Sequence, residues 1–329
     1  MSRRTRRLLS ATVAAGLALS VGSAALAAPV GALKQFKVPT ARSAPRYITS
    51  GSDGNRWFTE GSEFTNPPRI GRITPAGAIT EFEANCSGCL LGDIIEGPGR
   101  ILYVTSNDAT LMRFDLASGT FLDPIDIPRS SALDGNLAVS GDDIWFDEFN
   151  VDSLWRYDTA GADTGFTAFP TVEPDDVEVD SDGFPWFTSA DDQSVNRLDP
   201  ATGDVQRFPV TSGLNPGSIT IATDEQIWFT SIIPGGVGRL DPDTGTVTTL
   251  STPGTDPETI AASPDGSVWF AQERKGNIAR IDNNGIETGV ITESKVVKGS
   301  GPFGITVAPN ADPWYTMPPA NKIAAFVLR

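Results

Sequence analysis

The segment Asp256-Pro257-Glu258 places two carboxylates around a proline, in a chain that is rich in acids and has no histidine. The absence of histidine excludes a Ser-His-Asp triad and a histidine metal site. A carboxyl group that is desolvated or crowded by like charges has a raised pKa and can act as a general base near neutral pH. Glu258 is the first candidate for such a base, with Asp256 beside it.

These residues belong to a repeat that is centred on an aromatic residue, in motifs such as IWF and VWF. Each unit begins with an apolar stretch, which a turn connects to the aromatic stretch. A stretch with a central basic residue comes next, and a last short stretch ends the unit. Asp, Pro and Gly in the turns favour hairpins, so each unit predicts four short antiparallel strands. The centres lie 41 to 46 residues apart, at Trp57, Tyr103, Trp145, Trp186, Trp228, Trp269 and Trp314.

Four-stranded units of about 40 residues are typical of propeller blades. We therefore expect an all-β fold, a seven-bladed β-propeller of four-stranded antiparallel blades, as a single domain over residues 28–329. The last unit lacks a fourth strand, and the segment LKQFKVP at 33–39 matches the fourth strands of other units. This N-terminal strand is expected to join the last blade and close the ring, which removes exposed sheet edges. The central aromatic residues are expected to pack between blades.

Two positions of each unit are predicted to face one mouth of the central channel. The first follows the proline before the innermost strand; Asp93 and Asp134 are assigned to it in units without that proline. The second lies two or three residues beyond the aromatic pair. The candidate ligand-binding residues at or near these positions are Arg46, Glu60, Glu148, Asp175, Ser189, Ser231 and Arg274. Carboxylates converging here would bind Mg²⁺ or Ca²⁺, with Asp175 and Glu258 as candidate metal ligands. The alternative is a hydrated acidic rim with no ligand.

Residues 1–27 have the features of an export signal peptide. Arg3, Arg4, Arg6 and Arg7 precede an apolar run, and Ala25-Leu26-Ala27 forms a small-x-small cleavage site. We expect Sec or Tat export to the periplasm, the cell surface or the medium, with no transmembrane segment in the mature chain. Loss of these four arginines changes the formal net charge from −16 to −20. Such an acidic chain disfavours nucleic acid as a partner, and we expect a monomer.

The two cysteines, Cys86 and Cys89, stand in a CSGC motif within a predicted loop. Two cysteines without histidine do not complete a tetrahedral zinc site, and a redox CxxC normally opens a helix. In an exported protein the motif predicts a local disulfide.

The stretches GSDGNRWFTE (51–60) and IGRITPAGAITEF (70–82) closely resemble the streptogramin B lyase (virginiamycin B lyase) family, and weaker copies cover the rest of residues 28–329. The resemblance implies a seven-bladed propeller that opens a cyclic depsipeptide antibiotic by magnesium-dependent elimination. It also implies four site positions, where the family has His, Glu, His and Glu. This chain has Gly217, Asp256, Glu258 and Gln272 there.

Those substitutions make the family's usual reaction improbable, because elimination beside an ester needs a base poised near neutral pH. The first hypothesis is a binding or interaction module for a small molecule, peptide or glycan. The second is a divergent metal-assisted lyase or lactone-cleaving hydrolase, with Glu258 as base and Asp256 and Gln272 as the other candidate catalytic residues. The third is a structural repeat protein of the cell surface.

Overall fold

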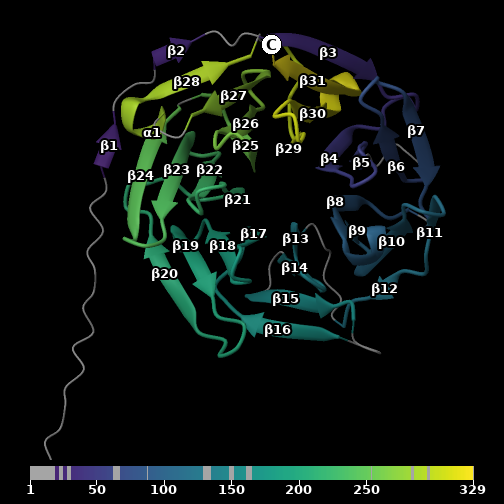
Figure 1. Ribbon diagram of the computed structural model, residues 1–329, viewed down its shortest axis with the longest axis horizontal. Coiled ribbons are helices and arrows are strands. Elements are labelled where there is room, and N and C mark those ends of the chain that lie inside the picture. The colour runs from purple at the N-terminus through teal and green to yellow at the C-terminus, as the bar shows by residue number, and fades with distance from the viewer. Residues whose placement is uncertain are drawn as a thin grey trace, which may run out of the picture.

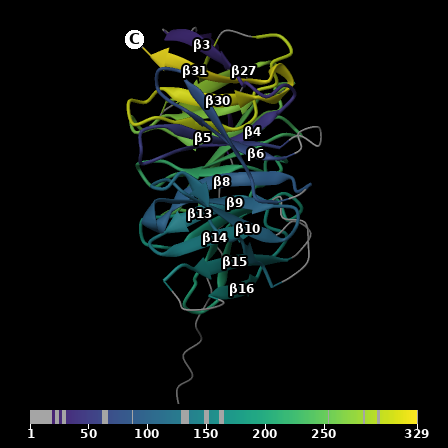
Figure 2. The same ribbon diagram turned by 90° about the vertical axis from the view of Figure 1, so that its right-hand side faces the viewer.

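The computed structural model describes residues 19–21, 25–27, 31–61, 67–86, 88–128, 135–147, 152–160, 165–252, 254–282, 285–294 and 297–328. Their strands form seven sheets around a central channel, as Figure 1 shows along the channel and Figure 2 from the side. Each sheet is an antiparallel blade whose first strand lies innermost. The predicted seven-bladed, all-β propeller is therefore confirmed.

Blades one to four follow the sequence in order from the channel outwards. Blade one contains β4 (Pro45–Ser50), β5 (Arg56–Glu60), β6 (Arg69–Ile73) and β7 (Ile79–Glu83). Blade two contains β8 (Leu91–Gly97), β9 (Ile101–Ser106), β10 (Thr110–Asp115), β11 (Thr120–Phe121) and β12 (Ile125–Asp126). Blade three contains β13 (Leu137–Ser140), β14 (Asp143–Asp147), β15 (Ser153–Asp158) and β16 (Phe166–Pro170). Blade four contains β17 (Asp176–Val179), β18 (Pro185–Ser189), β19 (Ser194–Leu198) and β20 (Val205–Pro209).

The remaining blades repeat this order. Blade five contains β21 (Ile219–Ile221), β22 (Ile227–Ser231), β23 (Gly236–Asp241) and β24 (Thr246–Ser251). Blade six contains β25 (Pro257–Ala262), β26 (Val268–Gln272), β27 (Asn277–Ile281) and β28 (Val290–Glu293). Blade seven contains β29 (Ile305–Val307), β30 (Pro313–Met317), β31 (Lys322–Leu328) and β3 (Gly31–Lys37).

Five short elements lie outside this scheme. Within the predicted signal peptide, two strands pair in parallel with β24 and β28: β1 (Leu19–Val21) and β2 (Ala25–Ala27). The helical segments are η1 (Pro98–Arg100), α1 (Gly285–Thr288) and η2 (Pro318–Ala320). Within the described ranges, no helix is long and apolar enough to cross a membrane.

The ring closes through β3, as the sequence predicts. This strand runs antiparallel to β31 in one unbroken register from Gly31↔Leu328 to Lys37↔Lys322. In Figure 1 the purple β3 lies alongside the yellow β31 near the C-terminus. Both ends of the chain thus contribute to blade seven, and its last edge is covered.

Each central aromatic residue packs against the next blade around the ring. Trp57, for example, lies in one buried cluster with Leu102, Val104 and Phe114 of blade two, and its ring centroid is 5.2 Å from that of Phe114. Similar clusters contain Tyr103, Trp145, Trp186, Trp228, Trp269 and Trp314, each with side chains of the following blade. The predicted inter-blade core is confirmed, and it accounts for the loss of polar alternation in these strands.

The arginine of the third strand stands directly opposite the tryptophan of the second. Trp57 pairs with Arg72 and Trp269 with Arg280 across the sheet, with each guanidinium carbon 5.8 Å from the indole centroid. These are cation–π distances, so the repeated basic residue covers the edge of the aromatic core. The third strand also has a glycine, Gly71, which packing requires, because a Cβ there would lie 2.0 Å from the Phe58 ring.

A buried hydroxyl near the end of the second strand joins neighbouring blades. The Thr105 hydroxyl accepts the N–H of Asp93 in its own blade (2.8 Å) and donates to the carbonyl of Gly135 in the next (3.1 Å). Threonines occupy the same position at Thr59, Thr188, Thr230 and Thr316. We call these residues the threonine clasps. Besides Thr105, three of them donate to carbonyl groups that begin the next blade, those of Gly217, Glu258 and Arg46.

The loop between β3 and β4 is fixed by one half-buried side-chain amide. Asn321 donates to the carbonyls of Val38 (3.2 Å) and Thr40 (2.8 Å). Its Oδ1 accepts the hydroxyl of Ser43 (3.0 Å) and the N–H of Ala44 (3.2 Å). Its backbone has φ of 54°, a left-handed conformation that asparagine tolerates. A single side chain therefore anchors the connection between the closing strand and blade one.

We predict that Asn321→Ala lowers the free energy of unfolding by about 2 kcal/mol, since four hydrogen bonds are lost and the carbonyls of Val38 and Thr40 lose a donor. Urea denaturation of the full chain measures this. Asn321→Gly accepts the left-handed backbone but lacks the amide, so it should be destabilised as well. Wild-type stability of the glycine variant would show that backbone strain, and not the amide, matters here.

Candidate functional site

The mouth of the channel is the end at which the innermost strands begin, and Glu258 lies there at the start of β25. The pairing of β25 with β26 shifts between Pro257 and Ile260, so Glu258 lies in a bulge and has no directly opposite partner. Bulges re-aim side chains and are common beside functional sites. Burial and the neighbouring carboxylate of Glu273 raise the pKa of Glu258 to about 7, although Arg46 opposes this shift. Glu258 thus exchanges a proton near neutral pH.

Arg46 occupies the corresponding bulge of blade one, where the register shifts between Pro45 and Ile48. Its side chain is exposed. The guanidinium carbon lies 4.7 Å from the ring centroid of Phe303 and 5.6 Å from that of Tyr47. The two rings meet edge to face, 5.4 Å apart. Arg46 therefore reaches across the start of blade seven toward Glu258 in blade six.

Asp256 and Arg274 form an ion pair at the rim, with Nε 2.7 Å from Oδ2. Asp256 has φ of 45°, and its carbonyl accepts the N–H of Glu273 (3.1 Å). This contact connects the turn after β26 to the segment before β25. Asp256 therefore holds Glu273 next to Glu258, and its carboxylate is already neutralised.

Gln272 does not face solvent. Its side chain is fully buried at the end of β26, and neither amide atom has a hydrogen-bond partner among the described residues. The residue directly opposite on β27, Asn277, has an Oδ1 atom in the same condition. Gln272 lies beside the mouth but has no titratable group.

The magnesium that the family resemblance implies does not fit these residues. Asp256 is held by Arg274, the amide of Gln272 is buried and Gly217 offers no side chain. Asp175, the other predicted ligand, has Asp191 as its charged neighbour, whereas Glu258 has Glu273 and Arg46. In the part of the chain that the structure describes, no three histidine, cysteine or acidic residues gather as metal ligands. No step of the chemistry below is routed through a metal.

Three predicted ligand-binding residues are buried and do not line the mouth. Ser231 accepts the N–H of Asn215 (3.0 Å) and donates to the carbonyl of Pro234 (2.7 Å), while Ser189 accepts the N–H of Asp192 (3.3 Å). Both hydroxyls therefore support their own loops. Glu60 is buried beneath the β3–β4 loop, where burial and the charge of Glu81 raise its pKa to about 8. Glu148 lies outside the described residues.

The prediction for Asp93 is wrong by one residue. The carbonyl groups that accept from the threonine clasps define equivalent positions in the blades. Arg46 and Glu258 hold this position in blades one and six, and Gly135, not Asp134, holds it in blade three. In blade two Asp93 lies one residue beyond it. Its carboxylate instead faces the channel and accepts the N–H of Leu137 (2.9 Å). Asp134 itself is not among the described residues. The units without proline offered no signal that fixes this register.

The channel also contains two acidic residues that the sequence did not predict as site residues, Asp176 and Glu178. Together with Asp93 they line a cavity of about 370 Å³ formed by the innermost strands. Asp176 accepts the N–H groups of Val177 and Ile219, both at 2.8 Å, and so joins blades four and five. Burial raises the pKa of Asp93 to about 6 and of Asp176 to about 7. Burial together with these two acids raises that of Glu178 to about 8.

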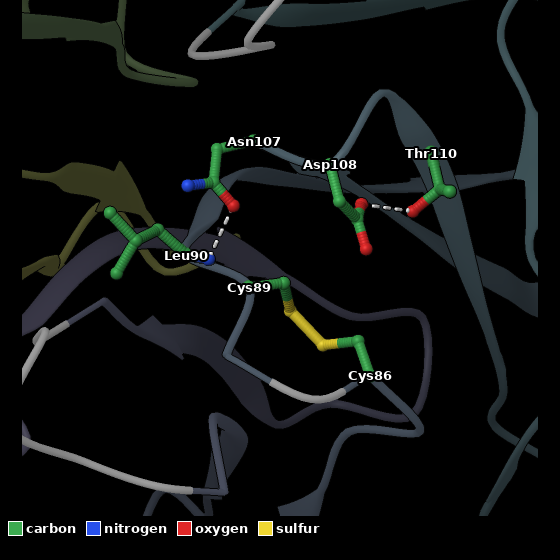
Figure 3. Close-up of a disulfide and its surroundings, with 6 residues drawn as sticks. All are labelled: Cys86, Cys89, Leu90, Asn107, Asp108 and Thr110. Atoms are coloured by element: carbon green, nitrogen blue, oxygen red, sulfur yellow. Dashed lines mark hydrogen bonds between the residues drawn. A yellow bond between two sulfur atoms is a disulfide. The ribbon is translucent and has the colours of Figure 1, made fainter.

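Figure 3 shows the loop between β7 and β8, where a disulfide joins Cys86 and Cys89 with Cα atoms 6.0 Å apart. The next residue, Leu90, donates its N–H to Oδ1 of Asn107 (2.7 Å). The bond closes a very short loop, so its effect is local. It stiffens the connection that leads into β8 at the mouth.

Comparisons with known proteins agree with this architecture. The profile of the virginiamycin B lyase family matches residues 25–213 and 204–328. A streptogramin B lyase structure superimposes with a TM-score of 0.79 at 24% identity, covering 91% of this chain and 98% of the other. A catalytically inactive virginiamycin B lyase from Staphylococcus aureus with quinupristin gives the same identity and TM-score, covering 91% and 100%. The selenomethionine-substituted S. aureus enzyme gives 0.78 at 23%, again covering 91% and 100%. No curated protein matches the chain. At these identities the structural likeness shows the fold.

The channel acids predict an unusual pH dependence of stability. Their unfolded pKa values are about 4, so between about pH 4 and 8 the folded state binds more protons and stability falls as pH rises. We expect the thermal unfolding midpoint to be higher at pH 5 than at pH 8 by roughly 5 °C or more. Differential scanning calorimetry across this range measures it, and a flat or rising profile would contradict it.

A variant assigns the effect to the channel. Glu178→Gln keeps the shape but removes the ionisation, so it should match the wild type at pH 5 and be more stable at pH 8. Asp182→Asn, in an exposed turn of the same blade, is the control and should leave the profile unchanged.

The poor fit of the site to a metal gives another prediction. Millimolar Mg²⁺, Ca²⁺ or EDTA should each change the thermal midpoint by less than about 1 °C, since a cation that bound the folded state would raise it by mass action. A clear rise with one cation that EDTA reverses would refute this interpretation.

Proposed function

The chain belongs to the virginiamycin B lyase family, and we propose that within this family it is a binding protein whose channel mouth takes a small polar molecule, peptide or glycan beside Glu258. One observation carries the proposal. Glu258, a carboxyl group that titrates near neutrality, stands at the mouth with an exposed arginine, while the equivalent lyase positions hold Gly217 and a buried Gln272. Polar recognition groups are thus present where the family's paired acid–base groups are missing.

We further propose that the protein works outside the cytoplasm, after removal of residues 1–27. The basic segment, the apolar run and the small-x-small motif support this. The acidic surface and the disulfide are compatible with such an environment.

A second candidate function is proton abstraction by Glu258, in a lyase or a lactone-cleaving hydrolase. Its support is the pKa of about 7, which gives the carboxylate more basicity than an ordinary glutamate and leaves much of it ionised at neutral pH. In this reaction Glu258 takes the proton, Glu273 disfavours its ionised form and raises its basicity, and the Asp256–Arg274 pair fixes the turn that carries Glu273. Gln272 is too deeply buried to transfer a proton.

A ligand screen tests the binding function. We expect at least one member of a panel of amino acids, N-acetyl dipeptides, mono- and disaccharides and small carboxylates to raise the thermal midpoint and to show saturable binding in calorimetry. Glu258→Ala should weaken that binding at least tenfold, because alanine offers neither a hydrogen-bond donor nor an acceptor at the mouth. Asp182→Asn, an exposed acid in the turn at the other end of blade four, should leave the affinity unchanged.

The other functions give different results in the same samples. Turnover of a streptogramin B or a lactone, detected by mass spectrometry and abolished in Glu258→Gln, would establish the enzyme. Its rate would then rise with pH through about 7, as Glu258 loses its proton. No binding and no turnover across the panel would leave the structural repeat protein as the better interpretation.

A further inference from the structure

Arg46 differs from three other arginines at the edges of the blades, each of which is paired with a carboxylate. Arg274 lies 2.7 Å from Asp256, Arg69 lies 2.9 Å from Glu83 and Arg280 lies 3.0 Å from Asp265. In the described ranges Arg46 forms neither an ion pair nor a side-chain hydrogen bond; its guanidinium lies near the rings of Phe303 and Tyr47, and its charge acts on Glu258. Its N–H donors are therefore available to a ligand.

The position of Arg46 is nevertheless fixed. Its carbonyl accepts two hydrogen bonds from blade seven, one from the Thr316 hydroxyl (2.6 Å) and one from the N–H of Gly304 (3.1 Å). A Cβ on Gly304 would lie 2.3 Å from this carbonyl oxygen, so only glycine allows the approach. The guanidinium then stacks on Phe303, and a stacked guanidinium loses little entropy when it binds. The arginine is held ready without being neutralised.

We propose that Arg46 is the anion-binding residue of the mouth and that its ligand carries a carboxylate group. This proposal rests on the proposed binding function. A guanidinium with free parallel N–H groups matches a carboxylate bidentately. Phe303 and Tyr47 offer an aromatic surface beside it for the rest of the ligand.

The surrounding charges favour a carboxylate over a phosphate. Glu258 and Glu273 lie on the side of Arg46 that faces blade six, and the whole chain carries a formal charge of −16. A dianionic phosphate would be repelled by both, whereas a monoanion is repelled less. A protonated Glu258 also donates a hydrogen bond to a carboxylate oxygen, which supplies a second contact.

The experiment measures binding of matched probes by isothermal titration calorimetry. Benzoate and N-acetylglycine carry the carboxylate, benzamide and N-acetylglycinamide are their neutral counterparts, and benzylamine carries a positive charge. We expect benzoate or N-acetylglycine to bind at least tenfold more tightly than its amide. Arg46→Gln should lose at least tenfold of that affinity. Arg46→Lys keeps the charge but not the bidentate geometry, and should show an intermediate loss.

Arg207→Gln is the matched control, since it removes another exposed arginine, one that is already paired with Asp192 in blade four. It should change carboxylate affinity less than twofold. Equal losses in Arg207→Gln and Arg46→Gln would overturn the proposal by showing a general charge effect. So would an amide that binds as tightly as its acid. Thermal midpoints of all variants show whether the fold is kept.

The failure of this inference is distinguishable from that of the proposed function. If a sugar, an amide or benzylamine binds, and Glu258→Ala weakens it while Arg46→Gln does not, the mouth is a binding site and the carboxylate assignment is wrong. If no probe and no member of the wider panel binds, both are wrong.

Discussion

The threonine clasps are the interaction on which the rest of this structure depends. A propeller blade has no covalent fixation to its neighbour apart from one connecting segment, and apolar packing between sheets is not directional. A hydroxyl that accepts from its own blade and donates to the next fixes their relative height, because both bonds have strict geometry. Thr105, Thr230 and Thr316 all bridge blades in this way or donate across the seam. The clasps also hold the carbonyl groups of Gly217, Glu258 and Arg46, so they determine where the mouth residues begin.

Asp147 is an aspartate at the position that the threonine clasps occupy in other blades, and its contacts show what this position requires. In blade three Asp147 replaces the threonine and accepts the N–H of Asn136 (2.7 Å), as the hydroxyl does elsewhere. The bond to the next blade comes from the Asn136 side-chain amide, which donates to the carbonyl of Asp175 (2.9 Å). The substitution buries a carboxyl group beside Asp176, and burial raises the pKa of Asp147 well above its ordinary range. Two residues thus perform what one threonine does elsewhere.

Much of the fold could be predicted from sequence, because the repeat makes the same physical demand seven times. A tryptophan opposite an arginine, a glycine beneath a phenylalanine and an Asp-Gly turn each recur, so each unit supports the interpretation of the others. The closing strand followed from the unmatched last unit. The site was less predictable, since its residues are the positions at which the repeat varies. Sequence spacing brought Glu258, Asp256 and Arg46 to the mouth, but it could not show that Asp93 lies one residue beyond the clasped position.

Burial could not be inferred from spacing either. Glu60, Ser189, Ser231 and Gln272 follow the aromatic strand at the same distance, and all are enclosed by the loops that cross the ends of the blades. Glu273 was overlooked because its effect on Glu258 arises from a turn that Asp256 holds in three dimensions. Such contacts between segments are fixed by tertiary structure, and no local pattern encodes them.

The same clasps explain how the mouth has diverged without loss of the fold. The backbone at 217, 258 and 46 is fixed by main-chain carbonyl bonds, so the side chains there are not needed for packing. At Gly217 a Cβ would meet only one atom within 4 Å, the Thr230 carbonyl oxygen at 3.7 Å, so no steric constraint requires glycine. Glu258 stands where the resemblance implies a histidine. Burial and Glu273 raise the pKa of Glu258 to about 7, which is within the ordinary range of an imidazole. A titration near neutral pH at this position does not need a histidine, because desolvation and Glu273 act on the carboxyl group that the clasped backbone presents. The two residue types differ in the sign of their charge. A histidine is neutral or positive, whereas this carboxyl group is neutral or negative. The positive charge that acts on Glu258 comes instead from Arg46, which the ring holds beside it.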